Sequence, residues 1–348
     1  MSSIFLLAAN LFRAASFSLT LIQSSTIDPG KHSALHPAAS QGRDIEWLYW
    51  MIFWICLVVF VLMIAALTGA SVRTYAGTQT EPLPLVEDEA GDRRASWVVG
   101  SVIGVTTLTL FVVLVLSVIT GKKVQGVESN NGLTIKVKAH QWWWEVIYPN
   151  SQADQTITTA NEIHVPISER VAIVTSSQDV IHSFWAPNVT GKRDLIPGYS
   201  SAFSFQIDTP GVYHGQCAEF CGLQHAHMGF AIIAEPPDQF QAWQQQQLAS
   251  AKDPTDEATT RGRQVFLTHS CVMCHTISGT DAGSRVGPDL THVGSRHMIA
   301  AETLPNIPGA LGGWILDPQQ LKPGTQMPAN ALSGDELQAL ISYLQSLE

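Results

Sequence analysis

Two long apolar stretches mark the first third of the chain. Residues 47–67 form a run of 21 positions without a charged side chain, and residues 97–119 form one of 23. A helix of either length crosses roughly 30 Å of hydrocarbon, and Trp47, Tyr49 and Trp50 at one end suit a membrane interface. The pattern predicts a hairpin of two transmembrane helices. Two buried helices of a soluble core are the alternative.

The first 27 residues have a less decisive pattern. Residues 4–22 are apolar apart from Arg13, without a basic start or a clean small-residue cleavage site. A signal peptide over residues 1–27 is the preferred interpretation. An uncleaved third span and a wrongly assigned start are the alternatives.

The hydrophobic period changes to two between Leu133 and Ala234. Phe203, Phe205 and Ile207 alternate with polar residues, and Asn, Pro and Gly clusters separate the short runs. This alternation indicates short half-buried strands and predicts an antiparallel sandwich. A polar stretch after residue 235 predicts a short helix and a linker, and Ser333 with Glu336 predicts a capping box that opens a final helix.

Charge and cysteine usage narrow the function. The formal net charge is −10, and without a basic patch the chain is not expected to bind nucleic acid. Of the five cysteines, four form two close pairs, C-x3-C and C-x2-C, each followed by histidine. Such pairs indicate metal or haem chemistry rather than a secreted disulfide scaffold.

Candidate metal ligands concentrate in residues 217–228. Two cysteines, two histidines and a methionine make up the set: His182, Cys217, Cys221, His225 and Met228. Thiolate, imidazole and thioether donors together favour copper. Two cysteines can each bridge two ions, which leaves one histidine for each ion, with the methionine sulfur and the backbone carbonyl of Glu219 completing them. A Cys2His2 zinc site, with His182 and either His225 or His227, is the alternative.

The ligand motif resembles the CuA site of cytochrome c oxidase subunit II. The resemblance extends to residues 179–185, residues 191–198 and the aromatic segment 141–144, in which Trp143 replaces a more usual tyrosine, and covers about residues 33–240. It implies that dinuclear copper is held by His182, Cys217, Glu219, Cys221, His225 and Met228. It also implies that the Glu219 side chain faces a Mg2+ site shared with subunit I. Trp142 would lie on the path by which electrons reach copper, although strand packing is its alternative role.

Residues 271–275 form C-x-x-C-H, the attachment motif of c-type haem. Cys271 and Cys274 would make two thioether bonds, and His275 would ligate the iron. A redox dithiol or part of a zinc site is the alternative.

An axial methionine and a buttress for the histidine are also expected. Met327, in a Gly-Thr-Gln-Met-Pro loop, is the preferred axial ligand, and Met298 and Met273 are its competitors. The carbonyl of Pro288 resembles the group that accepts the hydrogen bond of the iron-bound imidazole. Residues 257–348 therefore resemble a class I cytochrome c domain.

The expected fold is multidomain: a two-helix transmembrane hairpin, an all-β cupredoxin-like Greek-key sandwich and a C-terminal all-α class I cytochrome c domain. The expected divisions are a possible signal peptide at 1–27, the hairpin at 28–121, the copper domain at 122–236, a helix and linker at 237–256, and the cytochrome domain at 257–348. Because c-type haem is attached outside the cytoplasmic membrane, both soluble domains are expected on the periplasmic side of a bacterial inner membrane.

The resemblance implies the electron-accepting subunit II of a caa-type oxidase. Electrons would pass from haem c through copper to the haem of subunit I, where O2 is reduced to water. The implied partners are subunits I and III and cytochrome c or another c-type donor. Other interpretations are a stand-alone membrane-anchored copper and haem electron carrier, a nitrous oxide reductase, and a copper-delivery protein with a thioredoxin-like fold.

Overall fold

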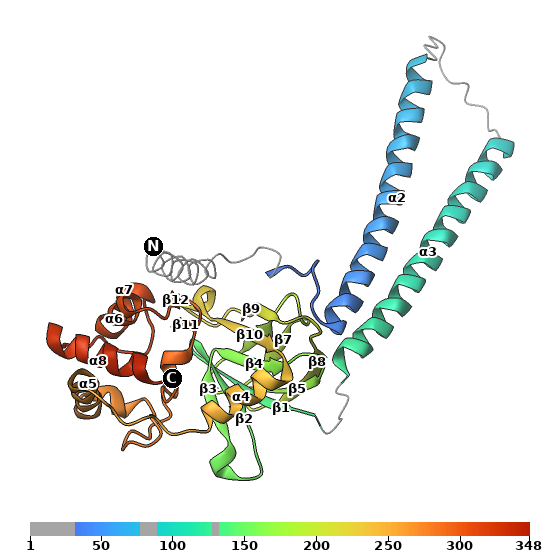
Figure 1. Ribbon diagram of the computed structural model, residues 1–348. Helices are drawn as coiled ribbons and strands as arrows, with labels where there is room; N and C mark the ends of the chain where they lie inside the picture. The colour runs from blue at the N-terminus through green and yellow to red at the C-terminus, as the bar shows by residue number, and fades with distance from the viewer. Residues whose placement is uncertain (1–31, 77–88, 127–131) are drawn as a thin grey trace, which may run out of the picture.

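The computed structural model describes residues 32–76, 89–126 and 132–348, so the predicted signal peptide lies outside the described residues. Figure 1 shows a helical hairpin that projects from a body formed by a β-sandwich and a helical C-terminal region. The expected fold class is confirmed: two apolar helices, a β-sandwich and a helical C-terminal region follow one another along the chain.

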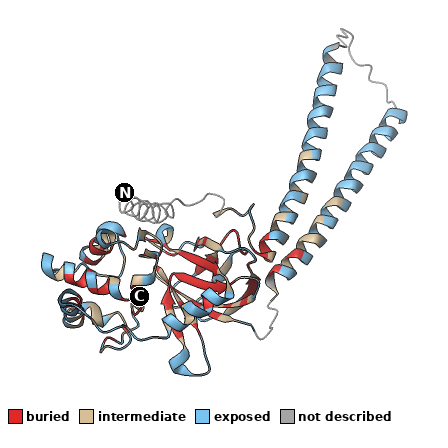
Figure 2. Cartoon of the chain, viewed as in Figure 1, coloured by how far each residue is buried: buried red, intermediate tan, exposed pale blue. Residues whose placement is uncertain are grey.

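The hairpin consists of α2 (Ser40–Ala76) and α3 (Glu89–Gln125), which extend beyond the apolar stretches at both ends. Both are long and apolar enough to cross a membrane, and no residue of their most apolar windows is buried. Figure 2 shows this exposure along the length of both helices. Helices of a soluble core would be buried, so that alternative is wrong. Exposed apolar surface on this scale is stable in lipid, not in water.

The base of the hairpin is fixed to the sandwich by polar contacts. Arg43, in the first turns of α2, forms an ion pair with Asp208 at 2.9 Å. Arg193 donates a hydrogen bond to the carbonyl of Val124, near the end of α3, at 2.9 Å. The sandwich therefore lies directly at one end of the membrane spans.

The sandwich contains two five-stranded sheets. The first has the strand order β3 (Ile157–Ala160), β2 (Trp143–Tyr148), β1 (Thr134–His140), β5 (Arg170–Ser177) and β8 (Ser201–Gln206). The second has the order β4 (Glu162–Pro166), β10 (Gly229–Glu235), β9 (Gly211–Cys217), β6 (His182–Trp185) and β7 (Arg193–Leu195). The pairs β1–β5 and β10–β4 are parallel, so the sandwich is not purely antiparallel. A period of two is common to both strand directions and cannot distinguish them.

An aromatic cluster fills the space between the sheets. Trp144, Phe184 and Phe230 are fully buried, with ring centroids 5.2 Å apart for Trp144–Phe230 and 4.2 Å for Phe184–Phe230. Gly215 is required beside them, because a Cβ there would lie 2.2 Å from the Phe230 ring. This packing supports the end of the second sheet that carries the predicted ligands.

The C-terminal region begins with α4 (Pro237–Gln247), whose Trp243 stacks on His164 of the sandwich. The remaining elements are α5 (Glu257–Thr268), β11 (Met298–Ile299), β12 (Leu304–Pro305), α6 (Pro308–Leu316), α7 (Pro318–Leu321) and α8 (Gly334–Ser346). The predicted capping box of Ser333 and Glu336 is present at the start of α8.

Gly262 allows α5 and α8 to cross closely. A Cβ at this position would lie 2.0 Å from the carbonyl oxygen of Ala339 and 2.6 Å from Tyr343 Cβ. The crossing therefore depends on the missing side chain.

We expect Gly262→Val to destabilise the C-terminal domain by about 3 kcal/mol, because the backbones must separate. The measurement is thermal unfolding of the purified chain, followed by circular dichroism. Gly334→Ala is the matched control, since nothing lies within 4 Å of its added Cβ. Equal midpoints for the two variants would contradict this account of the crossing.

Candidate copper and haem sites

The predicted copper ligands meet at one end of the second sheet. His182 begins β6, Cys217 ends β9, and Met228 directly precedes β10. The pairing of β6 with β9 places Phe184 opposite Cys217. Strand pairing thus brings together ligands that are 35 residues apart in sequence.

The first half of the cluster surrounds Cys217. Its Sγ lies 3.8 Å from His182 Nδ1 and 3.2 Å from the carbonyl oxygen of Glu219. His182 is fully buried, and Cys217 is nearly so. A thiolate, an imidazole and a backbone carbonyl therefore converge.

The second half surrounds Cys221. Its Sγ lies 3.6 Å from His225 Nδ1 and 3.9 Å from Met228 Sδ, and the two cysteine sulfurs are 3.8 Å apart. Met228 is 1% exposed, so its sulfur faces the cluster and not solvent. A zinc site of two cysteines and two histidines leaves this buried thioether without a role.

The contact between the two sulfurs shifts their pKa values in opposite directions: it lowers the pKa of Cys217 and raises the pKa of Cys221. Burial acts to lower the pKa of His182, but its bonds to Cys217 and Asp179 outweigh burial and raise it. Bound metal cations would stabilise both thiolates. The donor set fits two copper ions.

Asp179 orients the His182 ring. Its Oδ1 lies 2.8 Å from His182 Nε2, and its Oδ2 accepts a hydrogen bond from the backbone of Gln141 at 2.7 Å. This contact directs Nδ1 of His182 at Cys217, as a carboxylate partner does for a metal-binding histidine.

Glu219 and His227 are exposed, unlike the buried ligands. The Glu219 carbonyl faces Cys217, whereas its side chain is exposed. His227 lies 2.8 Å from Gln224 through its Nδ1, is exposed, and makes no contact with either cysteine sulfur. The described geometry thus assigns His225, and not His227, to the cluster.

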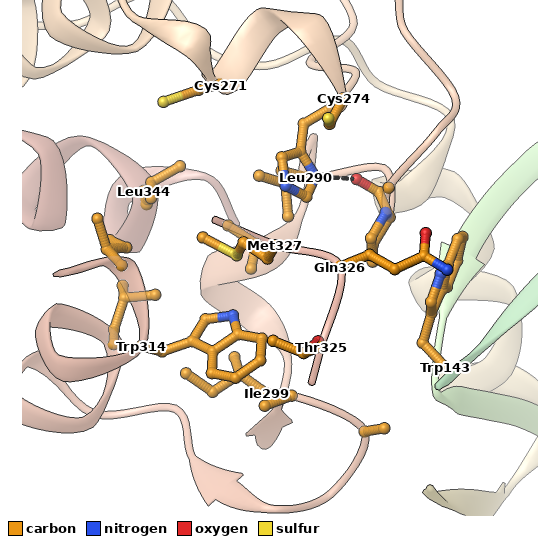
Figure 3. Close-up of a pocket in the computed structure, with 18 of the residues that line it drawn as sticks. Trp143, Cys271, Cys274, Leu290, Ile299, Trp314, Thr325, Gln326, Met327 and Leu344 are labelled. Carbon is orange, nitrogen blue, oxygen red and sulfur yellow. Dashed lines mark hydrogen bonds between the residues drawn. The ribbon is translucent and has the colours of Figure 1, made fainter. Parts of the chain in front are cut away.

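The C-x-x-C-H segment lines a cavity of about 320 Å³. Cys271, Cys274, His275 and Met327 all contribute to its walls, and Figure 3 shows Met327 between the two cysteines and Trp314. The remaining wall is largely apolar and includes Leu290, Ile299 and Leu344.

His275 is held for ligation of a metal in this cavity. Its Nδ1–H donates to the carbonyl of Pro288 at 2.7 Å, which leaves Nε2 as the unprotonated nitrogen. Burial lowers the pKa of His275, which favours the neutral imidazole. Gly287 makes room for the ring, since a Cβ there would lie 2.8 Å from His275 Cε1. The two cysteines, the neutral imidazole and the apolar wall fit a c-type haem.

All three candidate axial methionines line the cavity. Met273 is 71% exposed and lies within the attachment segment. Met298 belongs to β11, and its backbone N–H donates to Glu162 at 3.2 Å. The Met327 loop is fixed by Gln319, whose amide donates to the Met327 carbonyl at 3.0 Å.

Trp142 connects the two sites. Its indole N–H donates to the carbonyl of Cys221 at 3.0 Å, and the residue also lines the haem cavity together with Gln141 and Trp143. Trp142 is 8% exposed. Sequence patterns do not show that the sandwich forms part of the wall of this cavity.

The structure adds residues to which the sequence assigned no role. Asp179, Gln141 and Gly287 shape the two sites, and Lys322 is buried between the domains. An acidic residue three positions before a candidate ligand is a signal that could have indicated Asp179. Lys322 has no such signal, because its partners are backbone carbonyls distant in sequence.

Comparisons with known proteins agree with this architecture. The family described as cytochrome c oxidase subunit II, periplasmic domain, matches residues 150–235, and cytochrome c matches residues 259–348. Cytochrome c oxidase subunit 2 of Alkalihalophilus pseudofirmus is 34% identical over 98% of this chain and 97% of its own length. That of Bacillus sp. strain PS3 is 35% identical over 70% of this chain and 69% of its own. The periplasmic domain of subunit II from Bradyrhizobium japonicum is 29% identical, with a TM-score of 0.33, and is matched over 35% of this chain and 96% of its own.

A membrane-anchored sandwich with a copper-type donor set, followed by a cytochrome c domain, defines an electron-transfer subunit. The chain belongs to the cytochrome c oxidase subunit 2 family. It is therefore a subunit of a haem–copper oxidase complex, and a stand-alone electron carrier is not favoured.

We expect Asp179→Asn to weaken copper binding roughly 10–100-fold, because the His182 ring loses its carboxylate partner. The measurement is competitive copper titration of the full-length chain against a chelator. Asp154→Asn, at an exposed position away from the cluster, should leave the affinity unchanged. Equal affinities for the two variants would show that Asp179 does not orient the ligand.

Proposed function

We propose that this chain holds a dinuclear copper centre and a covalently attached haem c, through which electrons reach the oxidase core for reduction of O2 to water. When bound, both groups supply one-electron redox chemistry. The observation that carries the proposal is the pair of sulfurs, each with its own imidazole and its own third donor.

The proposed copper ligands are His182, Cys217, the carbonyl of Glu219, Cys221, His225 and Met228. Burial of both sulfurs excludes water from the cluster. His182, Cys217 and Met228 lie in or next to paired strands, and the other ligands lie in the short loop between β9 and β10. The sandwich therefore holds the ligand positions, which change little between charge states. Small rearrangement on reduction favours fast electron transfer.

The proposed haem ligands are Cys271 and Cys274 for attachment, with His275 and Met327 as the axial pair. The bond from His275 to Pro288 fixes the ring orientation. The hydrogen bonds of Gln319 to the loop of Met327 support the choice of this methionine over its two competitors.

Trp142 is proposed to couple the haem side of the chain to copper. Its indole contacts the Cys221 backbone, and the residue lines the haem cavity. Because only 8% of Trp142 is exposed, an external donor cannot dock on it directly. Cytochrome c or another c-type donor therefore delivers electrons at the haem domain.

Further partners and cofactors are proposed from the same arrangement. The exposed carboxylate of Glu219 is available for a Mg2+ ion shared with subunit I, and subunits I and III surround the two membrane spans. The soluble domains lie on the periplasmic side of a bacterial inner membrane, with residues 122–236 as the copper domain and residues 257–348 as the haem domain.

The test is metal analysis and electron paramagnetic resonance of the full chain, purified in detergent after haem maturation and copper loading. Two copper ions and one iron per chain, with one electron shared equally between two copper nuclei, are expected. Zinc, or one isolated copper ion, would reject the proposed centre.

We expect Cys221→Ser to abolish the mixed-valence copper signal, because one bridging sulfur is lost. The haem spectrum should stay unchanged, since Cys221 does not line the haem cavity. Cys56→Ser, in the exposed surface of α2, is the control. A mixed-valence signal that survives Cys221→Ser would remove this cysteine from the ligand set.

We expect Met327→Leu to lower the haem reduction potential and remove the methionine–iron charge-transfer band. Redox titration and near-infrared absorption measure both effects. Met298 lines the same cavity, and the control variant Met298→Leu should change neither property. The opposite result would make Met298 the axial ligand.

A further inference from the structure

The haem domain is hydrogen-bonded to the sandwich at several separate points. The bonds join Glu162 to the backbone N–H groups of His297 and Met298, His214 to Glu302, Gly229 to Ala301, Gln224 to Pro323, and Lys322 to His227. A flexibly tethered module would not need such a set of specific contacts. The two domains therefore meet in one defined arrangement.

Lys322 lies at the centre of this interface. It is 2% exposed, and its ammonium group donates to the carbonyls of His227 at 2.7 Å and Ala300 at 2.9 Å, with the carbonyl of Trp142 at 3.4 Å. Two of these carbonyls belong to the sandwich and one to the haem domain. A single side chain thus joins three segments.

A lysine ammonium group matches this geometry. An ammonium group has three N–H donors and no acceptor, which matches three converging carbonyls. Burial lowers the pKa of Lys322 to about 8, so the amine stays protonated at neutral pH. A buried ammonium is costly unless it is bonded in this way, so the contacts must form together with the interface.

The haem-domain side of the contact is a strained turn. Ala300, Ala301 and Glu302 all adopt left-handed φ values of 55°, 56° and 61°, which residues with a Cβ rarely do. This turn directs the Ala300 carbonyl at Lys322 and the Ala301 carbonyl at the N–H of Gly229, 3.1 Å away. Strain of this kind persists only where surrounding contacts fix it.

The contacts of Lys322 connect the two ligand loops. His227, whose carbonyl accepts from Lys322, directly precedes the copper ligand Met228, and Lys322 is five residues before Met327. Next to this bond, the Gln224 amide donates to the carbonyl of Pro323 at 2.7 Å. The copper-ligand loop and the loop of the axial methionine are therefore bonded to each other.

We propose that Lys322 is a positioning residue for electron transfer within this chain: it holds the copper-ligand loop against the Met327 loop and fixes the separation of the two redox sites. The proposal rests on the proposed function. It changes the role of the fusion, because the haem domain is held at one distance from copper and does not dock and release on a linker.

The test uses the full-length chain in detergent, loaded with haem and copper, as Lys322→Met and Lys322→Gln. Three properties are measured: hydrogen–deuterium exchange of residues 222–229 and 297–302, the haem-to-copper electron-transfer rate after flash reduction, and both reduction potentials. Lys252→Met is the matched control. Lys252 and Lys322 are the two lysines after residue 236, and Lys252 is exposed.

We expect faster exchange in both segments and an electron-transfer rate that falls roughly tenfold or more and becomes heterogeneous, since small displacements of reacting groups have large kinetic effects. Metal content and spectra should match the parent chain. The rates are compared at equal driving force with the two measured potentials, because loss of a buried positive charge shifts them. A chain without the copper or haem signals before mutation would instead reject the proposed function.

Exchange and rate equal to those of Lys252→Met would overturn the role of Lys322. If Lys322→Met fails to bind a cofactor, Lys322→Gln decides, because it keeps two N–H donors but is too short to reach all three carbonyls. Parent-like exchange and rate in Lys322→Gln would reject the proposal.

Discussion

The pairing of β6 with β9 is the constraint on which the copper site depends. It aligns the strand that begins at His182 with the strand that ends at Cys217. The loop of residues 218–228 then contributes Cys221 and completes the ligand cluster. The aromatic packing of Trp144 and Phe184 beneath these strands fixes the pairing. The distances between the ligand side chains are therefore set by the packing of the β-sandwich and not by the loop alone.

The second cofactor site depends on contacts between domains. The cavity of the C-x-x-C-H segment takes part of its wall from Gln141, Trp142 and Trp143 of the sandwich. Trp142 also bonds the backbone of Cys221. Trp142 is 8% exposed in the fused chain, so it offers little surface to an external donor.

Local chemistry at the two sites follows one principle. One histidine at each site has its second ring nitrogen occupied: His182 by the carboxylate of Asp179 and His275 by the carbonyl of Pro288. The partner fixes the ring and decides which nitrogen faces the metal. The bonds to Cys217 and Asp179 raise the pKa of His182, whereas burial in a largely apolar cavity lowers the pKa of His275.

The sequence by itself determined the domain order, the membrane hairpin, the capping box of α8 and the identity of the candidate ligands, because each depends on local period, helix capping or ligand spacing. It does not predict the parallel strand pairs, the orientation of His182 by Asp179, or the burial of Trp142. Nor could it show that Lys322 is buried against carbonyls of His227 and Ala300. Backbone carbonyls carry no side-chain signature, so contacts to them between distant segments are decided only when the domains pack.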